Sequence, residues 1–229
     1  MKKELKQITF EIRYEPNSRF LDKRGETASS IAGNLLEHWN ITENRVNFFS
    51  DENKYLNAFF SYKNLGLTSE SPNDDDIFVD NSKKFIKKAW IHFPSDKILR
   101  VGARSTYLVE IENEEKIRAF FNKRFLNIQT TIKKDEFNKV GFSAEFIDGS
   151  DTIFLKIDTV KSFESKKMFK DVSDEEQTIS GLIIDIDCFR ENLPVHTKQK
   201  DLSDFISNAI TKENKLKKEF LSQLLGNNN

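Results

Sequence analysis

Two arginines in the middle of the chain have the residue type and spacing of an anion-binding site. Arg100 and Arg104 lie in the segment ILRVGARSTYLVEI, from Ile98 to Ile111, in which apolar and polar residues alternate. If this segment is a strand, both side chains lie on one face about 13 Å apart, with Gly102 between them. The planar guanidinium group suits carboxylate and phosphate partners. The pattern predicts an anion-binding or partner-binding surface at Arg100 and Arg104, which Arg13 extends from another strand.

The same arginines also fit an ordinary solvent-facing strand. Glu11, Arg13 and Glu110 would occupy neighbouring polar faces, where they could form cross-strand ion pairs with Arg100 and Arg104. This is the simpler interpretation, and the anion-binding surface is the strongest functional alternative to it.

Two carboxylates near the C-terminal end form a second candidate site. Asp185 and Asp187 in GLIIDIDCF point to the same face of a strand, so they could hold a divalent metal ion or act as acid and base. No third carboxylate or histidine follows at a defined spacing, which favours a polar strand face. Asp158 follows Lys156 in FLKID, the reverse of the acid-x-lysine order common in nucleases, so we expect no nuclease site there.

The remaining reactive residue types form no recognisable constellation. His38, His92 and His196 have no second histidine or cysteine at a metal-ligand spacing, and Cys188 belongs to the apolar face of its predicted strand. No glycine-rich phosphate loop precedes a helix. We therefore predict no catalytic residues, no cofactor and no metal site, with Asp185 and Asp187 as the weak exception.

Length and composition indicate one α+β domain over 1–229, with 1–111 and 112–229 as an alternative subdivision. The 36 basic and 37 acidic residues nearly balance, giving a net charge of −1, which disfavours nucleic acid as the main partner. The 21 phenylalanines supply much of the core. A single cysteine, no signal-peptide pattern and no long apolar run lead us to expect a soluble cytoplasmic protein without membrane contact.

Alternating patterns and turn residues predict an antiparallel series of strands. The expected strands are 7–14, 45–50, 55–63, 84–93, 98–111, 128–133, 140–147, 152–161 and 178–188. Residues 68–76, TSESPNDDD, are expected to form an exposed loop.

Helical spacing predicts a helix from Ala28 to Trp39 with Thr27 as its cap, another beginning at Asn113, and a long closing helix from Leu202 to Leu225. The order of elements predicts an α+β fold in which about three helices pack on one face of a largely antiparallel sheet, and it leaves a two-fold pseudo-repeat open.

Four segments resemble a sporadically distributed family of uncharacterised bacterial proteins. They are FEIRYEP at Phe10–Pro16, LRVGARS at Leu99–Ser105, IDID at Ile184–Asp187 and LSDFISNAITKEN at Leu202–Asn214. Arg100, Gly102 and Arg104 match the family's central strand, where Ser105 replaces the usual aromatic residue. The family has no established activity. The resemblance implies a bacterial accessory protein, in a defence or toxin-control context.

Three functions follow from these observations. The leading hypothesis is a non-enzymatic binding or accessory protein that acts through a macromolecule, either a protein partner or a second copy of the chain. The first alternative is a nucleic-acid or nucleotide binder that uses Arg100 and Arg104. The second is a metal-dependent hydrolase that uses Asp185 and Asp187.

Overall fold

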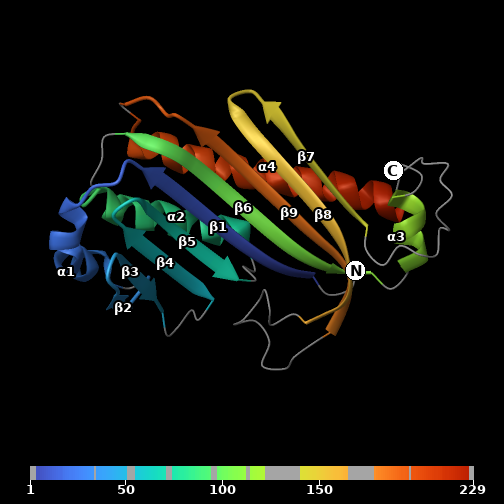
Figure 1. Cartoon of the computed structure of the whole chain (residues 1–229), viewed down its shortest axis with the longest axis horizontal. Coiled ribbons are helices and arrows are strands. Elements are labelled where there is room, and N and C mark those ends of the chain that lie inside the picture. Colours follow the sequence, from blue (N-terminus) through green and yellow to red (C-terminus); the bar gives the residue numbers. More distant parts are fainter. Residues whose placement is uncertain are drawn as a thin grey trace.

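The computed structural model describes residues 4–33, 35–50, 55–70, 74–93, 97–111, 114–121, 140–164, 178–195 and 197–226. Nine of the described segments are strands of one sheet, in the order β2-β3-β4-β5-β1-β6-β9-β8-β7, and each neighbouring pair is antiparallel (Figure 1). The strands are β1 (Glu4–Tyr14), β2 (His38–Ile41), β3 (Arg45–Phe49), β4 (Leu56–Ser61), β5 (Asn64–Glu70), β6 (Ile98–Glu110), β7 (Gly141–Asp148), β8 (Asp151–Glu164) and β9 (Thr178–Glu191).

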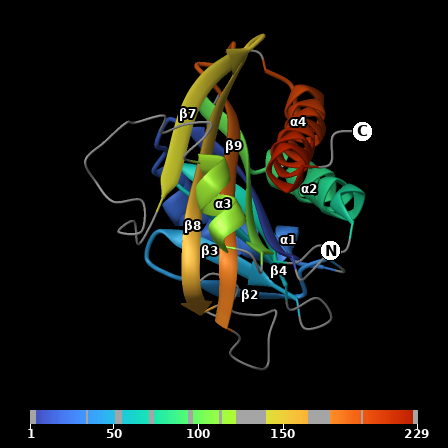
Figure 2. The same cartoon turned by 90° about the vertical axis from the view of Figure 1, so that its right-hand side faces the viewer.

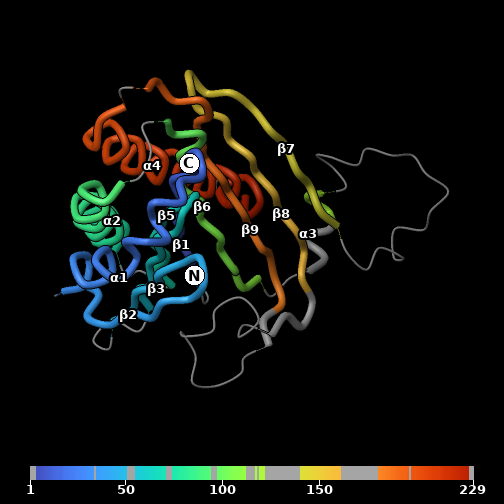
Figure 3. Tube along the Cα trace, turned by 60° about the vertical axis from the view of Figure 1, so that its left-hand side comes forward, coloured from blue at the N-terminus to red at the C-terminus, as the bar shows by residue number. Residues whose placement is uncertain are grey.

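The described residues also form four helices, which lie on one side of the sheet. They are α1 (Arg19–Ile31), α2 (Asp75–Trp90), α3 (Glu114–Phe121) and α4 (Gln199–Leu225). Figures 2 and 3 show α2 and α4 covering the same face, Figure 3 shows α1 beside α2, and Figure 1 shows α3 near the C-terminal end of α4. We call the opposite face, on which no described helix lies, the open face. The fold is therefore α+β with one large antiparallel sheet, as the sequence predicts.

Alternation along the strands builds the core between sheet and helices. On β1, Ile8, Phe10 and Ile12 are fully buried beneath the helices, while the residues between them face the open side. On β6, Val101, Ala103 and Tyr107 are fully buried, whereas Arg100 and Arg104 line a hollow on the opposite face. On β9, Ile184 and Ile186 are fully buried, whereas Asp185 and Asp187 line the same hollow. Because the period of side chains in a strand is two, each of these strands presents an apolar face to the helices and a polar face to the opposite side.

Six of the predicted strands correspond closely to β1, β3, β4, β6, β7 and β8, and the seventh, 178–188, lies within β9. The expected strand 128–133 lies outside the described residues. The long closing helix is confirmed as α4, and the helix expected from Asn113 is α3, which ends at Phe121. There are four described helices instead of three, and the pseudo-repeat is not confirmed.

The helix predicted from Ala28 to Trp39 is wrong. Helix α1 instead begins at Arg19 and ends at Ile31, and Trp39 lies in the edge strand β2. Ala32 takes an extended conformation, and Gly33 has a φ of 154°, so the chain leaves the helix just where the apolar spacing continues. Apolar residues that fit a helical period thus come from a helix end and a following strand.

The strand predicted over 84–93 is also wrong, and so is the loop predicted over 68–76 at both of its ends, while its residues 71–73 lie outside the described residues. Residues 75–90 form α2, and residues 68–70 end β5, a strand that the sequence did not reveal. Two of the three consecutive aspartates explain the error: Asp74 caps the helix by accepting a hydrogen bond from the backbone N–H of Asp76, at 2.8 Å. The acidic run is a helix start, and the apolar residues that follow it have the spacing of the buried helix face.

The two halves of the chain share this one sheet. Strand β6, from the first half, pairs with β9, from the second, over eleven residue pairs from Arg100 with Glu191 to Glu110 with Gly181. No helix in the described part of the chain has the length and apolar character of a membrane span.

Candidate functional site

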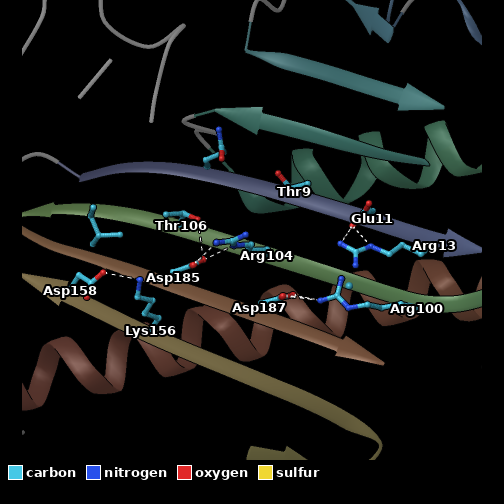
Figure 4. Close-up of a pocket in the computed structure, with 13 residues that line it drawn as sticks. Thr9, Glu11, Arg13, Arg100, Arg104, Thr106, Lys156, Asp158, Asp185 and Asp187 are labelled. Carbon is cyan, nitrogen blue, oxygen red and sulfur yellow. Dashed lines mark hydrogen bonds and ion pairs between the residues drawn. The ribbon is translucent and has the colours of Figure 1, made fainter. Parts of the chain in front are cut away.

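Four neighbouring strands, β1, β6, β9 and β8, form a hollow on the open face with a volume of about 450 Å³. We call it the groove, and Figure 4 shows its charged side chains. The lining residues are Gln7, Thr9, Glu11, Arg13, Arg100, Gly102, Arg104, Thr106, Lys156, Asp158, Ile183, Asp185 and Asp187.

Strand register brings these residues together. Arg104 lies opposite Thr9 on one side and Asp187 on the other, and Asp187 lies opposite Phe154. Because all four strands are antiparallel neighbours, every second residue of each contributes to the same surface. The arginines and the aspartates that the sequence singled out as two separate sites are therefore one site.

The pair of Arg104 and Asp185 spans β6 and β9 diagonally. Nε of Arg104 donates to Oδ1 of Asp185 at 2.8 Å, and Nη2 donates to Oδ2 at 2.6 Å, so the pair is bidentate. The hydroxyl of Thr106 donates to the same carboxylate at 3.2 Å. The bond to Asp185 raises the pKa of the Arg104 guanidinium above its ordinary value. This arrangement holds the guanidinium in one place.

Arg100 is held more deeply than Arg104. Its Nη2 donates to both carboxylate oxygens of Asp187, at 3.0 and 2.8 Å, and its guanidinium lies 4.4 Å from the ring centre of Phe189. The group also folds over Gly102, where a Cβ atom would stand 3.0 Å from Nη1. Burial raises the pKa of Asp187, although the Arg100 guanidinium opposes this rise. Arg100 therefore acts mainly in the structure of the groove floor.

Two further ion pairs complete the groove. On β1, Nε of Arg13 donates to Glu11 at 2.8 Å, and Asn64 donates to the other oxygen of Glu11 at 2.6 Å. Although burial alone would raise the pKa of Glu11, these hydrogen bonds bring it below its ordinary value. On β8, Nζ of Lys156 lies 3.0 Å from Asp158.

Most of these ion pairs share one orientation. In the pairs of Arg13, Arg104 and Lys156, the cationic side chain is 49–58% exposed, whereas the carboxylate partner is only 12–19% exposed. The carboxylates thus form the floor, and the cations cover them on the solvent side. Formal charges in the groove balance, yet the surface that a ligand would meet is cationic.

The three predicted binding residues, Arg13, Arg100 and Arg104, all line the groove. The arginines of β6 do form cross-strand ion pairs, but their partners are Asp185 and Asp187 instead of Glu11 or Glu110. Each of the two carboxylates considered for metal binding is therefore engaged by an arginine. Among the described residues, no group of three or more histidine, cysteine or acidic side chains is placed to hold a metal ion.

One polar cluster on the helix side of the sheet escaped the sequence analysis. Lys6 on β1 is buried and donates to Asp75 on α2 and to Asn214 on α4, and beside it Ser105 donates to the fully buried carboxyl group of Glu213. A signal was present, because Lys6 has the same strand phase as the apolar Ile8, Phe10 and Ile12, and a lysine in that phase points into the core.

No protein-family model matches the sequence, and no curated protein matches it significantly.

Proposed function

We propose that this chain is a non-enzymatic binding protein that acts through a protein partner, and that the partner contacts the groove on the open face. The observation that carries the proposal is the shared orientation of three ion pairs, with buried carboxylates below and exposed cations above. An exposed cationic surface of this kind complements an acidic surface on a partner. Such complementarity between two proteins raises the association rate and selects the partner. Arg100, Gly102 and Arg104, which resemble the central strand of a family of uncharacterised bacterial proteins, line this groove. That resemblance extends the proposal to a role in bacterial defence or toxin control.

A second property of the groove also supports binding. Long cationic side chains normally lose conformational entropy when they are fixed by a ligand. Here, the floor carboxylates already hold the guanidinium groups of Arg13 and Arg104 through two nitrogens each. These side chains therefore lose less conformational entropy on binding than freely solvated arginines would, which favours binding of a ligand at the groove.

Site-specific crosslinking in the native host tests this proposal. A photo-reactive p-benzoylphenylalanine in place of Thr9 lies in the groove, whereas the same residue in place of Lys84 lies on the exposed side of α2. We expect one discrete crosslinked protein from position 9 and none from position 84. The purified partner should then bind the wild-type protein, and Arg104→Glu should abolish binding while Lys84→Glu leaves it unchanged.

Equal crosslinking from both positions, or binding that survives Arg104→Glu in a folded variant, would contradict a partner on the open face. A chain that yields no crosslink at position 9 in cells where it is expressed would also contradict it.

A further inference from the structure

We infer that the groove binds an extended segment of its partner that carries acidic side chains about four residues apart. This inference rests on the proposed function and specifies the chemistry of the partner. A hollow of about 450 Å³ has the size of a small-ligand or short-peptide site. The groove therefore fits a peptide segment.

The two outward arginines retain hydrogen-bonding capacity for such a segment. Arg104 uses Nε and Nη2 for Asp185, and Arg13 uses the same two nitrogens for Glu11. A guanidinium group has five N–H donors, and within the described residues none accepts a bond from Nη1 of either arginine. A carboxylate of a ligand can therefore bind without displacing the carboxylate of the floor.

The spacing of the exposed cations gives the spacing of the ligand's acids. Arg13 lies on β1, one strand away from Arg104, and four residues along the strand direction from it. Lys156 lies on β8, two strands away from Arg104 on the other side, and two residues along the strand direction from it. With about 3.4 Å per residue and 4.8 Å between strands, the Cα atom of Arg104 lies roughly 14 Å from that of Arg13 and roughly 12 Å from that of Lys156. Four residues of an extended peptide span about 13 Å.

The floor argues against a nucleic acid as the occupant. A polynucleotide carries a charge on every nucleotide, so it would bring phosphates over the four floor carboxylates, Glu11, Asp158, Asp185 and Asp187. Single strands also rely on exposed aromatic rings for stacking, and the ring of Phe189 is covered by Arg100. A peptide with separated acids places neutral residues over the carboxylates.

Fluorescence anisotropy with synthetic probes tests the inference on the full chain. The probe is a labelled nine-residue peptide of serine and threonine with glutamate at positions 1, 5 and 9. Its controls are the same peptide with glutamine at these positions, a peptide with three adjacent glutamates, and a single-stranded dT12. We expect the spaced-glutamate peptide to bind at least tenfold more tightly than each control, and higher salt to weaken its binding.

Matched protein variants assign the binding to the groove. Arg13→Gln should weaken binding of the spaced-glutamate peptide about tenfold, and this variant keeps its fold because Glu11 retains the hydrogen bond from Asn64. Arg104→Gln should weaken it similarly, and its unfolding midpoint is measured alongside because Asp185 loses its partner. Lys84→Gln on α2 should leave binding unchanged.

Tighter binding of dT12, equal binding of the glutamate and glutamine peptides, or full binding by Arg13→Gln would overturn the inference. A partner crosslinked through position 9 that has no acidic segment would overturn it as well, while leaving the proposed binding function in place.

Discussion

Glu213 on α4 carries a fully buried carboxyl group that is only partly satisfied by hydrogen bonds. It is fully buried between α4 and the sheet, where Ser105 donates to one oxygen and the other oxygen, Oε1, has no described partner. Burial raises the pKa of Glu213 to about 8, although the hydrogen bond from Ser105 and the charge of Lys6 oppose the shift. At neutral pH, the folded protein therefore holds this group mainly in its protonated form.

This pKa predicts that stability falls as the pH rises. An unfolded glutamate ionises near pH 4.3, so the folded state binds an extra proton between that pH and about 8. The contribution of Glu213 is fully favourable below this window and is lost through it, at a rate of about 1.4 kcal/mol per pH unit. Glu213→Gln, an uncharged isostere, should remove this dependence and unfold at a higher urea concentration than the wild type at pH 8.

Urea denaturation at pH 5 and pH 8 measures the effect. The difference between the variant and the wild type should be larger at pH 8 than at pH 5, and the exposed Glu26→Gln on α1 should show no such change. Parallel stability curves for Glu213→Gln and the wild type would show that Glu213 is ionised in the folded protein.

At the scale of single residues, the sequence identified most of the charged groove. Arg13, Arg100, Arg104, Asp185 and Asp187 were each placed on a polar strand face because alternation fixes the direction of a side chain. Their pairing could not be predicted, because Arg100 and Asp187 are 87 residues apart. Only the register of β6 with β9 decides which carboxylate meets which arginine.

At the scale of elements, substitution by alanine is expected to have opposite effects on stability at two glycines. Gly25 lies within α1, and a Cβ atom there would meet no other atom within 4 Å. Gly25→Ala should therefore stabilise the protein by about 0.5–1 kcal/mol, because alanine loses less backbone entropy in a helix. Gly181 lies in β9, where a Cβ atom would collide with the carbonyl oxygen of Val109 on β6. Gly181→Ala should destabilise it by roughly 1–3 kcal/mol.

Chemical denaturation of both variants at one pH checks this pair. Equal effects of the two substitutions would mean that β6 and β9 do not approach as closely at Gly181 as described. The same pair also separates two roles of glycine. At Gly25, glycine only adds backbone entropy to the unfolded chain, whereas at Gly181 the missing Cβ atom leaves the space that β6 requires.

Helix α2 was predicted wrongly for a physical reason that does not apply to the strands of the groove. The strands β1, β6, β8 and β9 each have one buried and one exposed face, so their sequences alternate and could be recognised. The segment from Lys84 to Phe93 includes the end of α2 and the three residues after it, and it contains a short run of aromatic and β-branched residues that also suits a strand. The helical state of α2 depends on the cap at Asp74 and on packing against α4, which is distant in sequence.

At the scale of the whole molecule, the helix layer is attached to the sheet through a polar link as well as through the apolar core. Lys6 on β1 donates to Asp75 on α2, and Asn214 on α4 donates to the same carboxylate. Lys6 also donates to Asn214 at 3.3 Å. Three elements from the beginning, middle and end of the chain therefore meet at one buried lysine, whose pKa is lowered by burial despite the attraction of Asp75.

Asp75→Ala should therefore destabilise the protein by about 3 kcal/mol at pH 7, because it leaves the charge of Lys6 buried without its carboxylate. The loss should shrink as the pH rises toward 10, since the lowered pKa of Lys6 lets the folded state release its proton before the unfolded chain does. The double variant Lys6→Met, Asp75→Leu should recover much of the stability at pH 7, because it replaces the ion pair by apolar side chains. Urea titrations of the three proteins at pH 7 and pH 10 measure these differences.

Asp75 also lies in the first turn of α2, where an acidic residue stabilises the helix through its interaction with the helix dipole. A loss that is equal at both pH values would therefore assign the effect to the helix start and would contradict a link through Lys6.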